Sequence, residues 1–129
     1  MIHLDTNLLI DLVTVGCPRI DLIRDWLRGG ETLAVSAIAW SEFCNGPHSR
    51  EQKDAVFAIL GRQVHPFDAA QAEQASRLFH YTGRRRGSHA DCMIAAAAMS
   101  QEAPIATRNI KDFQRFEAYG LKLNPIPTE

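Results

Sequence analysis

The chain has 129 residues, of which 46% are hydrophobic and 22% are charged, and its formal net charge is -1. This composition is ordinary for a globular protein and excludes a disordered one, and the length fits one domain over residues 1–129. The balanced charge excludes a protein that coats nucleic acid, which would be strongly basic. It does not exclude an enzyme that acts on nucleic acid.

The predicted elements alternate between short apolar runs and longer amphipathic ones. In chain order they are a strand at 2–4, helices at 8–13 and 18–28, a strand at 32–35, helices at 37–45 and 50–60, a strand at 64–67, a helix from 68 to about 82, a helix at 90–99, a strand at 104–107, a short helix or turn at 111–116 and a possible fifth strand at 121–123. Thr6 or Asn7 is expected to cap the first helix. Pro66 limits the third strand to a sheet edge.

This alternation predicts a three-layer α/β/α fold around a mostly parallel sheet of four to five strands, with helices on both faces. The helix at 90–99 is rich in alanine and apolar on nearly all sides, so we expect it to be buried between layers. In parallel sheets of this kind, sites lie outside the carboxyl ends of the strands. That rule selects the acidic residues considered next.

Four acids lie at or near that edge: Asp5, Glu42, Asp91 and Asp112. Asp5 directly follows the first strand, where it either caps the next helix or faces the crevice. Asp91 is in the first turn of the buried helix, where it either interacts with the helix dipole or binds a partner or metal, and burial favours the second role. Glu42 and Asp112, taken singly, are typical of surface residues.

The four acids are more informative as a set than singly. Several carboxylates in one crevice repel each other unless they take up protons or bind a cation. Oxygen ligands suit Mg²⁺ or Mn²⁺ rather than zinc, and Thr107 and Asn109 can add neutral oxygens. This donor set is typical of metal-assisted hydrolysis of a phosphodiester bond.

Four stretches in order along the chain resemble the motifs of PIN-domain ribonucleases of the VapC toxin type: Leu4–Asn7, Val35–Phe43, His89–Ala96 and Ala106–Phe113. The resemblance implies Asp5 and Asp91 as central metal ligands, with Glu42 and Asp112 completing the catalytic site and Asp112 serving as a third ligand. Thr6, Thr107 and Asn109 are expected as supporting polar side chains. Whether Asn109 or Asp112 is the main fourth ligand, and whether one or two metals bind, stays open.

The same resemblance implies an endoribonuclease that depends on Mg²⁺ or Mn²⁺, forms a homodimer and is inhibited by a small antitoxin. Trp26, Trp40 and Phe43 are expected to pack in the core, and any exposed members would line a groove for that antitoxin. The run Arg84, Arg85 and Arg86 either contacts RNA phosphates near the site or forms a solvated helix end.

The cysteines and the ends of the chain bear on the compartment. Cys17, Cys44 and Cys92 are odd in number and far apart, which predicts free, buried thiols in a reducing compartment rather than a thiol active site. No apolar run approaches the ~18 residues of a membrane span, and MIHLDTN lacks the basic start of a signal peptide. We therefore expect a cytoplasmic protein without membrane contact.

Three other functions are compatible with parts of this pattern. A structure-specific DNA or RNA nuclease outside a toxin–antitoxin pair would use the same acids. A PIN-like binding module that has lost catalysis would keep the fold, although the presence of all four acids argues against it. A flavodoxin-type phosphate-binding domain is disfavoured because no glycine-rich loop follows the first strand.

Overall fold

The computed structural model describes residues 1–126, and residues 127–129 are outside the described part. Its strands are β1 (Ile2–Leu4), β2 (Leu33–Ser36), β3 (Val64–His65) and β4 (Ile105–Ala106). Its helices are α1 (Thr6–Leu12), α2 (Arg19–Arg28), α3 (Ala37–Cys44), α4 (Arg50–Ile59), α5 (Ala69–Tyr81), α6 (His89–Ser100), α7 (Ile110–Gln114) and the 3₁₀ turn η1 (Glu117–Tyr119).

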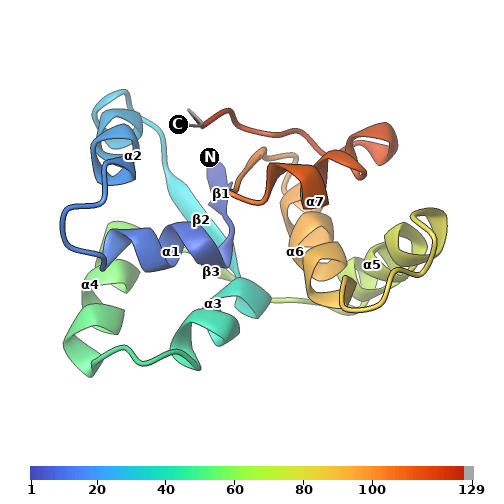
Figure 1. The fold of residues 1–129 in the computed structure, drawn as a ribbon, viewed down its shortest axis with the longest axis horizontal. Coiled ribbons are helices and arrows are strands. Elements are labelled where there is room, and N and C mark those ends of the chain that lie inside the picture. The colour runs from blue at the N-terminus through green and yellow to red at the C-terminus, as the bar shows by residue number, and fades with distance from the viewer. Residues whose placement is uncertain (127–129) are drawn as a thin grey trace.

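The four strands form one parallel sheet in the order β3-β2-β1-β4, so the chain starts in the middle of the sheet and builds outward in both directions. Figure 1 shows α1, α2 and α4 on one side of these strands and α5, α6 and α7 on the other. The predicted three-layer α/β/α fold is therefore confirmed. Because all strands are parallel, the residues that follow β1, β2 and β4 are brought to one edge of the sheet.

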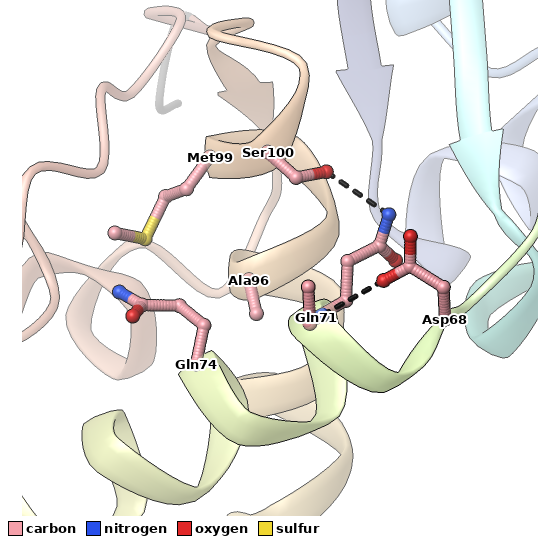
Figure 2. Close-up of a pocket in the computed structure, with 7 residues that line it drawn as sticks. Asp68, Gln71, Gln74, Ala96, Met99 and Ser100 are labelled. Atoms are coloured by element: carbon pink, nitrogen blue, oxygen red, sulfur yellow. Dashed lines mark hydrogen bonds between the residues drawn. The ribbon is translucent and has the colours of Figure 1, made fainter.

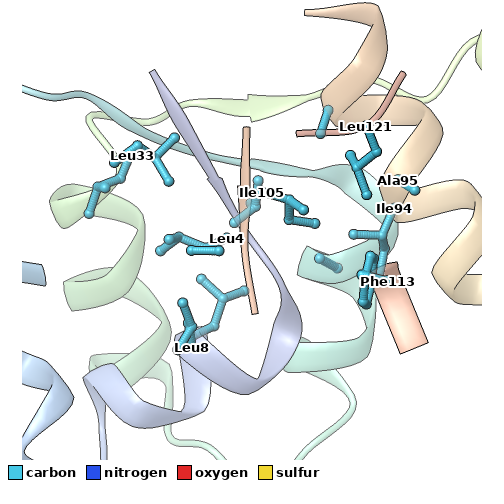
Figure 3. Close-up of a cluster of buried hydrophobic side chains, with 14 of the residues drawn as sticks. Leu4, Leu8, Leu33, Ile94, Ala95, Ile105, Phe113 and Leu121 are labelled. Carbon is cyan, nitrogen blue, oxygen red and sulfur yellow. The ribbon is translucent and has the colours of Figure 1, made fainter. Parts of the chain in front are cut away.

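Burial of β-branched and alanine side chains holds the layers together. β1, β2 and β4 are buried along their whole lengths, and α6 is buried from Ile94 to Ala98. Figure 3 shows Leu4 and Ile105 at the centre of this core, with Leu8 contributed by α1 and Phe113 by α7. The small alanine side chains let α6 lie close to the sheet, which fixes the position of its N-terminal turn at the edge where the strands end.

Three predicted features of the fold are wrong in detail. Residues 121–123 form no strand: Leu123 makes only an isolated parallel bridge to Ile105. The third strand ends at His65, because Pro66 has no N–H to continue the pairing. The first helix is capped by Asp5 rather than by Thr6 or Asn7, since the Asp5 side chain accepts a hydrogen bond from the Thr6 amide.

The expectations on the cysteines are met in part. All three are free thiols, but only Cys92 is buried as expected, while Cys17 and Cys44 are half-buried. Phe43 is buried, and Trp26 and Trp40 pack against the core while remaining partly accessible. Over residues 1–126, the helices are too short or too polar for any of them to cross a bilayer.

Candidate active site

Asp5 is the most deeply buried of the four acids. It is only 4% exposed, and its two carboxylate oxygens have different partners. Oδ1 accepts from the backbone N–H of Thr6 at 2.8 Å, and Oδ2 accepts from the Thr107 hydroxyl at 2.7 Å and from the Asn7 amide at 3.2 Å. Both roles foreseen for Asp5 are therefore compatible, because one oxygen caps α1 while the other faces β4.

The environment of Asp5 has opposing effects on its charge. Burial raises the pKa of this carboxyl most strongly, and the hydrogen bonds from Thr107 and the Thr6 amide partly offset that effect. The nearby Glu42 carboxylate raises the pKa further. The fold thus holds a carboxylate where its charge is poorly solvated, which is the situation that a bound cation relieves.

Glu42 is exposed, as expected for a lone glutamate on a helix, yet it is tied to the site. The Thr6 hydroxyl donates to Glu42 Oε1 at 2.6 Å, so the first residue of α1 joins α3 to the edge of the sheet. Thr6 was predicted only as a supporting polar residue. Its amide binds Asp5 and its hydroxyl binds Glu42, so it sets the relative position of two of the four acids.

Asp91 lies in the first turn of α6 and is half-buried. Its pKa is raised from 3.8 to about 6, first by burial and then by the negative charges of Asp5 and Asp112, with a smaller effect of Glu42. Arg115 opposes this rise, its Nη2 lying 4.0 Å from Asp91 Oδ2. The charges that act on Asp91, together with the hydrogen bond from Thr6 to Glu42, indicate that the four predicted acids lie near one another.

Asp112 is partly accessible, with a side chain that is 40% exposed. Its Oδ1 accepts from Arg85 Nη1 at 3.5 Å, so the arginine-rich connection before α6 reaches the acidic site. Arg84 and Arg86 are exposed beside it. An exposed pair of this kind is worth little energy and exchanges readily with other ligands.

Thr107 and Asn109 lie between β4 and α7. The Thr107 hydroxyl donates to Asp5 and accepts from the Asn109 amide at 3.0 Å. The loop beside them opens into a hollow of about 590 Å³, which is lined by Arg108, Asn109, Ile110, Lys111, Asp112 and Gln114. This hollow adjoins Asp112 and carries two cationic side chains, which suits an anionic ligand.

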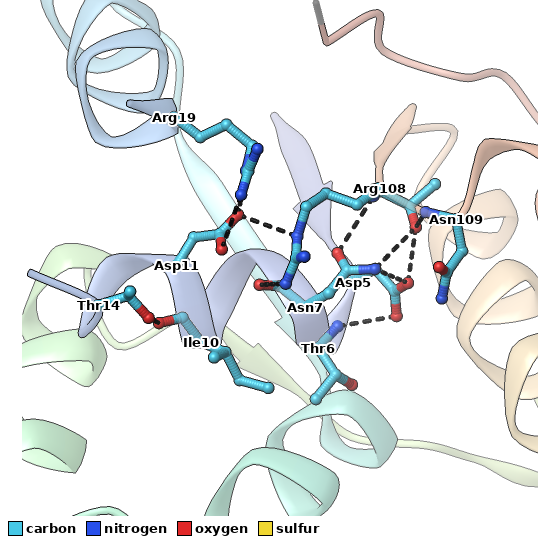
Figure 4. A network of polar contacts seen from close by, with 10 residues as sticks. Asp5, Thr6, Asn7, Ile10, Asp11, Thr14, Arg19, Arg108 and Asn109 are labelled. Atoms are coloured by element: carbon cyan, nitrogen blue, oxygen red, sulfur yellow. Dashed lines mark hydrogen bonds and ion pairs between the residues drawn. The ribbon is translucent and has the colours of Figure 1, made fainter. Parts of the chain in front are cut away.

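An ion-paired network that the sequence interpretation missed supports this loop (Figure 4). Asp11 of α1 is 3% exposed. Its Oδ2 accepts a hydrogen bond from Arg19 Nε at 2.6 Å and forms an ion pair with Arg108 Nε at 3.2 Å. Arg108 also donates from its backbone amide and its guanidinium to Asn7. The signal was present in the sequence, because an aspartate between apolar residues of a short helix needs a cationic partner if it is buried.

Arg115 was also missed. Within residues 1–126 its three guanidinium nitrogens are buried and have no hydrogen-bond partner, and the group lies over the Phe116 ring, 4.7 Å from the centroid. Its nearest carboxylate is Asp91. Arg115 therefore provides a buried positive charge next to Asp91.

A second cavity lies elsewhere and takes no part in this site. It has a volume of about 270 Å³ and lies between the start of α5 and the end of α6 (Figure 2). Gln71 and Ser100 line this cavity, and the Gln71 side-chain amide donates a hydrogen bond to the Ser100 hydroxyl at 3.0 Å. Ser100 and Asp91 are at opposite ends of α6, about 13 Å apart at 1.5 Å per residue, so the cavity is remote from the acids.

The gathered acids offer only oxygen ligands. In residues 1–126, no three acidic, histidine or cysteine side chains are close enough to form a ready-made metal site. Carboxylates that share a site repel one another unless a cation lies between them or one takes up a proton. The donor chemistry fits Mg²⁺ or Mn²⁺, which accept carboxylates together with water.

Comparison with known proteins agrees with this geometry. A family model described as the PIN domain matches residues 2–119. Ribonuclease VapC10 of Mycobacterium tuberculosis is 30% identical over 102 residues, which are 73% of this chain and 74% of that protein.

Solved structures extend the likeness to the whole fold. VapBC2 from Rickettsia felis, solved with a DNA fragment from the promoter, matches with a TM-score of 0.74 at 23% identity, over 98% of this chain and 100% of that one. VapBC-1 from nontypeable Haemophilus influenzae matches with a TM-score of 0.67 at 26% identity, over 96% and 97%. The chain thus belongs to the PIN-domain family and, within it, is similar to the VapC proteins.

Proposed function

We propose that this protein is an endoribonuclease that depends on Mg²⁺ or Mn²⁺ and acts as the toxin of a toxin–antitoxin pair. The observation that carries the proposal is the convergence of Asp5, Glu42, Asp91 and Asp112 at the carboxyl edge of a parallel sheet, with the pKa of Asp91 raised to about 6 by the other three and by burial. The similarity to Ribonuclease VapC10 supports RNA as the substrate.

Asp5, Asp91 and Asp112 are the residues proposed to hold the metal. When bound there, a divalent cation supplies an activated water and neutralises the charge that develops on the phosphate. The Thr107 hydroxyl and the Thr6 amide hold the two oxygens of Asp5 in fixed directions. One oxygen lone pair of Asp5 therefore stays available without any side-chain rearrangement.

Glu42 is proposed to accept the proton of the attacking water. It is exposed, so it is accessible to water and substrate, and the Thr6 hydroxyl bound to Oε1 at 2.6 Å fixes its carboxylate near Asp5. A base must lie within reach of the proton that it removes. Within residues 1–126 the other carboxylate oxygen of Glu42 accepts no hydrogen bond, and it is the atom assigned to this step.

The arginine run is proposed to contact RNA phosphates. Arg85 already reaches Asp112, and its two neighbours are exposed, so an RNA backbone at the acids would pass beside three guanidinium groups. Charge reversal of Arg84 and Arg86 should weaken RNA binding and flatten its dependence on salt. Unchanged affinity and slope would remove the arginines from the RNA site.

We also propose that a small antitoxin protein restrains the enzyme and that the chain forms a homodimer in the cytoplasm. The support for a protein partner is the likeness to VapBC complexes. The partly accessible Trp26 and Trp40 are candidates for contact with it. An arginine of such a partner would compete with metal for the four acids.

The decisive experiment is incubation of the purified protein with total RNA and Mn²⁺, with the cut ends mapped. Asp5→Asn is the control, because asparagine keeps the cap of α1 while removing the charge. Cleavage by the wild type that requires Mn²⁺ and is lost in Asp5→Asn supports the proposal. Cleavage of DNA in preference to RNA would favour a structure-specific nuclease, and no cleavage of either would favour an inactive binding module.

A further inference from the structure

Two segments meet twice beside the acidic site. The last residue of α5 and the turn after it contact the segment formed by α7 and η1, first through the Arg85–Asp112 pair at 3.5 Å. The second contact is a stack of Tyr81 on Tyr119, with ring centroids 5.1 Å apart and the planes inclined by 23°. The tyrosine stack and the Arg85–Asp112 pair therefore both join the end of α5 and the turn after it to the segment formed by α7 and η1, and Figure 1 shows α5 and α7 on the same side of the sheet.

The tyrosine pair is unusually accessible for stacked aromatic residues. Tyr81 is 58% exposed and Tyr119 is 40% exposed, and neither belongs to the core cluster. Stacking and a hydrogen bond of 3.3 Å from the Tyr119 hydroxyl to the Tyr81 carbonyl fix the direction of the two rings. The result is a flat aromatic surface held ready in water, which lowers the entropy cost of binding another flat group.

The arginine run follows Tyr81 closely in the chain. Arg84 follows Tyr81 by three residues and donates from Nε to His80 Nδ1 at 2.8 Å, which directs its guanidinium back along α5. Its backbone has a φ of 54°, a conformation that residues other than glycine rarely adopt. The following arginine reaches Asp112. The turn that follows Tyr81 thus holds one guanidinium group at His80 and another at Asp112.

We propose that the Tyr81–Tyr119 pair is a stacking site for an unpaired base of single-stranded RNA, at a position displaced from the bond that is cut. Aromatic rings with neighbouring arginines match the alternating bases and phosphates of a single strand. The three arginines favour this polyanion over an apolar protein partner. The inference rests on the proposed function and adds to it that the substrate is unpaired beside the cleavage site.

Binding can be measured without cleavage. Single-stranded RNA carrying 2-aminopurine is titrated with the protein in EDTA, and both anisotropy and the fluorescence of 2-aminopurine are recorded. Tyr81→Leu should weaken binding about tenfold, within the range of losses found for stacked bases, and abolish the quenching of 2-aminopurine. Tyr81→Trp should retain both, and Val15→Ala is the matched control because Val15 is a fully exposed apolar residue.

The salt dependence separates stacking from a merely structural role. Tyr81→Leu removes no charge, so the slope of binding against salt should stay as in the wild type, and the melting temperature should hold. Tyr119→Leu should repeat the loss. If both leucine variants bound RNA and quenched 2-aminopurine as the wild type does, the proposed stacking site would be wrong. Metal-dependent cleavage by the wild type would still support the proposed enzyme.

Two further outcomes also count against the stacking site. Unchanged RNA binding together with loss of self-association in Tyr81→Leu, measured by light scattering, would assign the tyrosines to a protein interface. A wild-type protein that neither binds nor cleaves RNA would overturn the proposed function and this site together.

Discussion

Asp91→Asn should stabilise the metal-free protein at neutral and alkaline pH. The pKa of Asp91 is raised from 3.8 to about 6 in the folded state, so the ionised form is disfavoured by folding. The unfolded chain loses this proton near pH 4 and the folded chain only near pH 6. The free energy of unfolding therefore falls as the pH rises from about 4 to about 6, and the whole loss of stability is present above about pH 6.

The size of the effect follows from the same values. A rise from 3.8 to about 6 corresponds to about 3 kcal/mol at 1.36 kcal/mol for each pH unit. Asp91 is 26% exposed, and its loss also removes a favourable interaction with the start of α6 of about 0.5 kcal/mol. Subtracting that interaction leaves about 2.5 kcal/mol, and solvent screening of the partly exposed carboxylate reduces it further. A net gain of about 1–2 kcal/mol is expected, which raises the melting temperature by about 3–10 °C in a chain of this length.

The assay is thermal unfolding of wild type and Asp91→Asn in EDTA at pH 4 and pH 8. The variant should melt higher only at pH 8, and Mg²⁺ should raise the melting temperature of the wild type more than that of the variant. Glu73→Gln is the control, because Glu73 is an exposed acid on α5. An equal effect of Asp91→Asn at both pH values, or none, would refute the reasoning from repulsion among the acids.

Three further predictions concern the groups behind the acids. Thr107→Val removes the hydroxyl bound to Asp5 and should weaken Mn²⁺ binding about tenfold in calorimetry, as for other groups that orient metal ligands; equal affinity would show that the hydroxyl does not matter. Asp11→Ala leaves two arginines around a buried site and should cost about 3 kcal/mol of unfolding free energy in urea, whereas a loss under 1 kcal/mol would contradict the network. Arg115→Met removes a charge that lowers the pKa of Asp91. As the pH is lowered, the variant should therefore lose half of its Mn²⁺ binding at a higher pH than the wild type does, and the same midpoint in both proteins would contradict that role.

The general fold could be predicted because it depends on patterns that are local in the sequence. Alternating apolar runs, the alanine-rich helix at 90–99 and the acids after strands each have a direct physical meaning. The end of the third strand was overestimated although Pro66 was visible, since pairing stops where the N–H is missing. The fifth strand reduced to one bridge at Leu123, which only the final packing decides.

The site was predicted less completely than the fold. Asp5 and Asp91 could be selected on physical grounds, because one follows a strand and the other lies in the first turn of a buried helix. Glu42 and Asp112 were selected mainly through the resemblance to the family. Arg115 and Asp11 could not be selected, because their roles depend on contacts between distant segments: Arg115 with Asp91, and Asp11 with Arg108. Arginines and aspartates on helices are ordinarily solvated, and only burial reveals that these two serve the site.

Direct titration with Mn²⁺ tests the central claim, that the gathered acids bind a divalent metal. Calorimetry on the wild type, Asp5→Asn and Glu73→Gln at pH 8 would measure binding without any substrate. The account predicts that the wild type and Glu73→Gln bind with the same affinity and that Asp5→Asn loses binding at least tenfold. Equal affinity in all three proteins would contradict it.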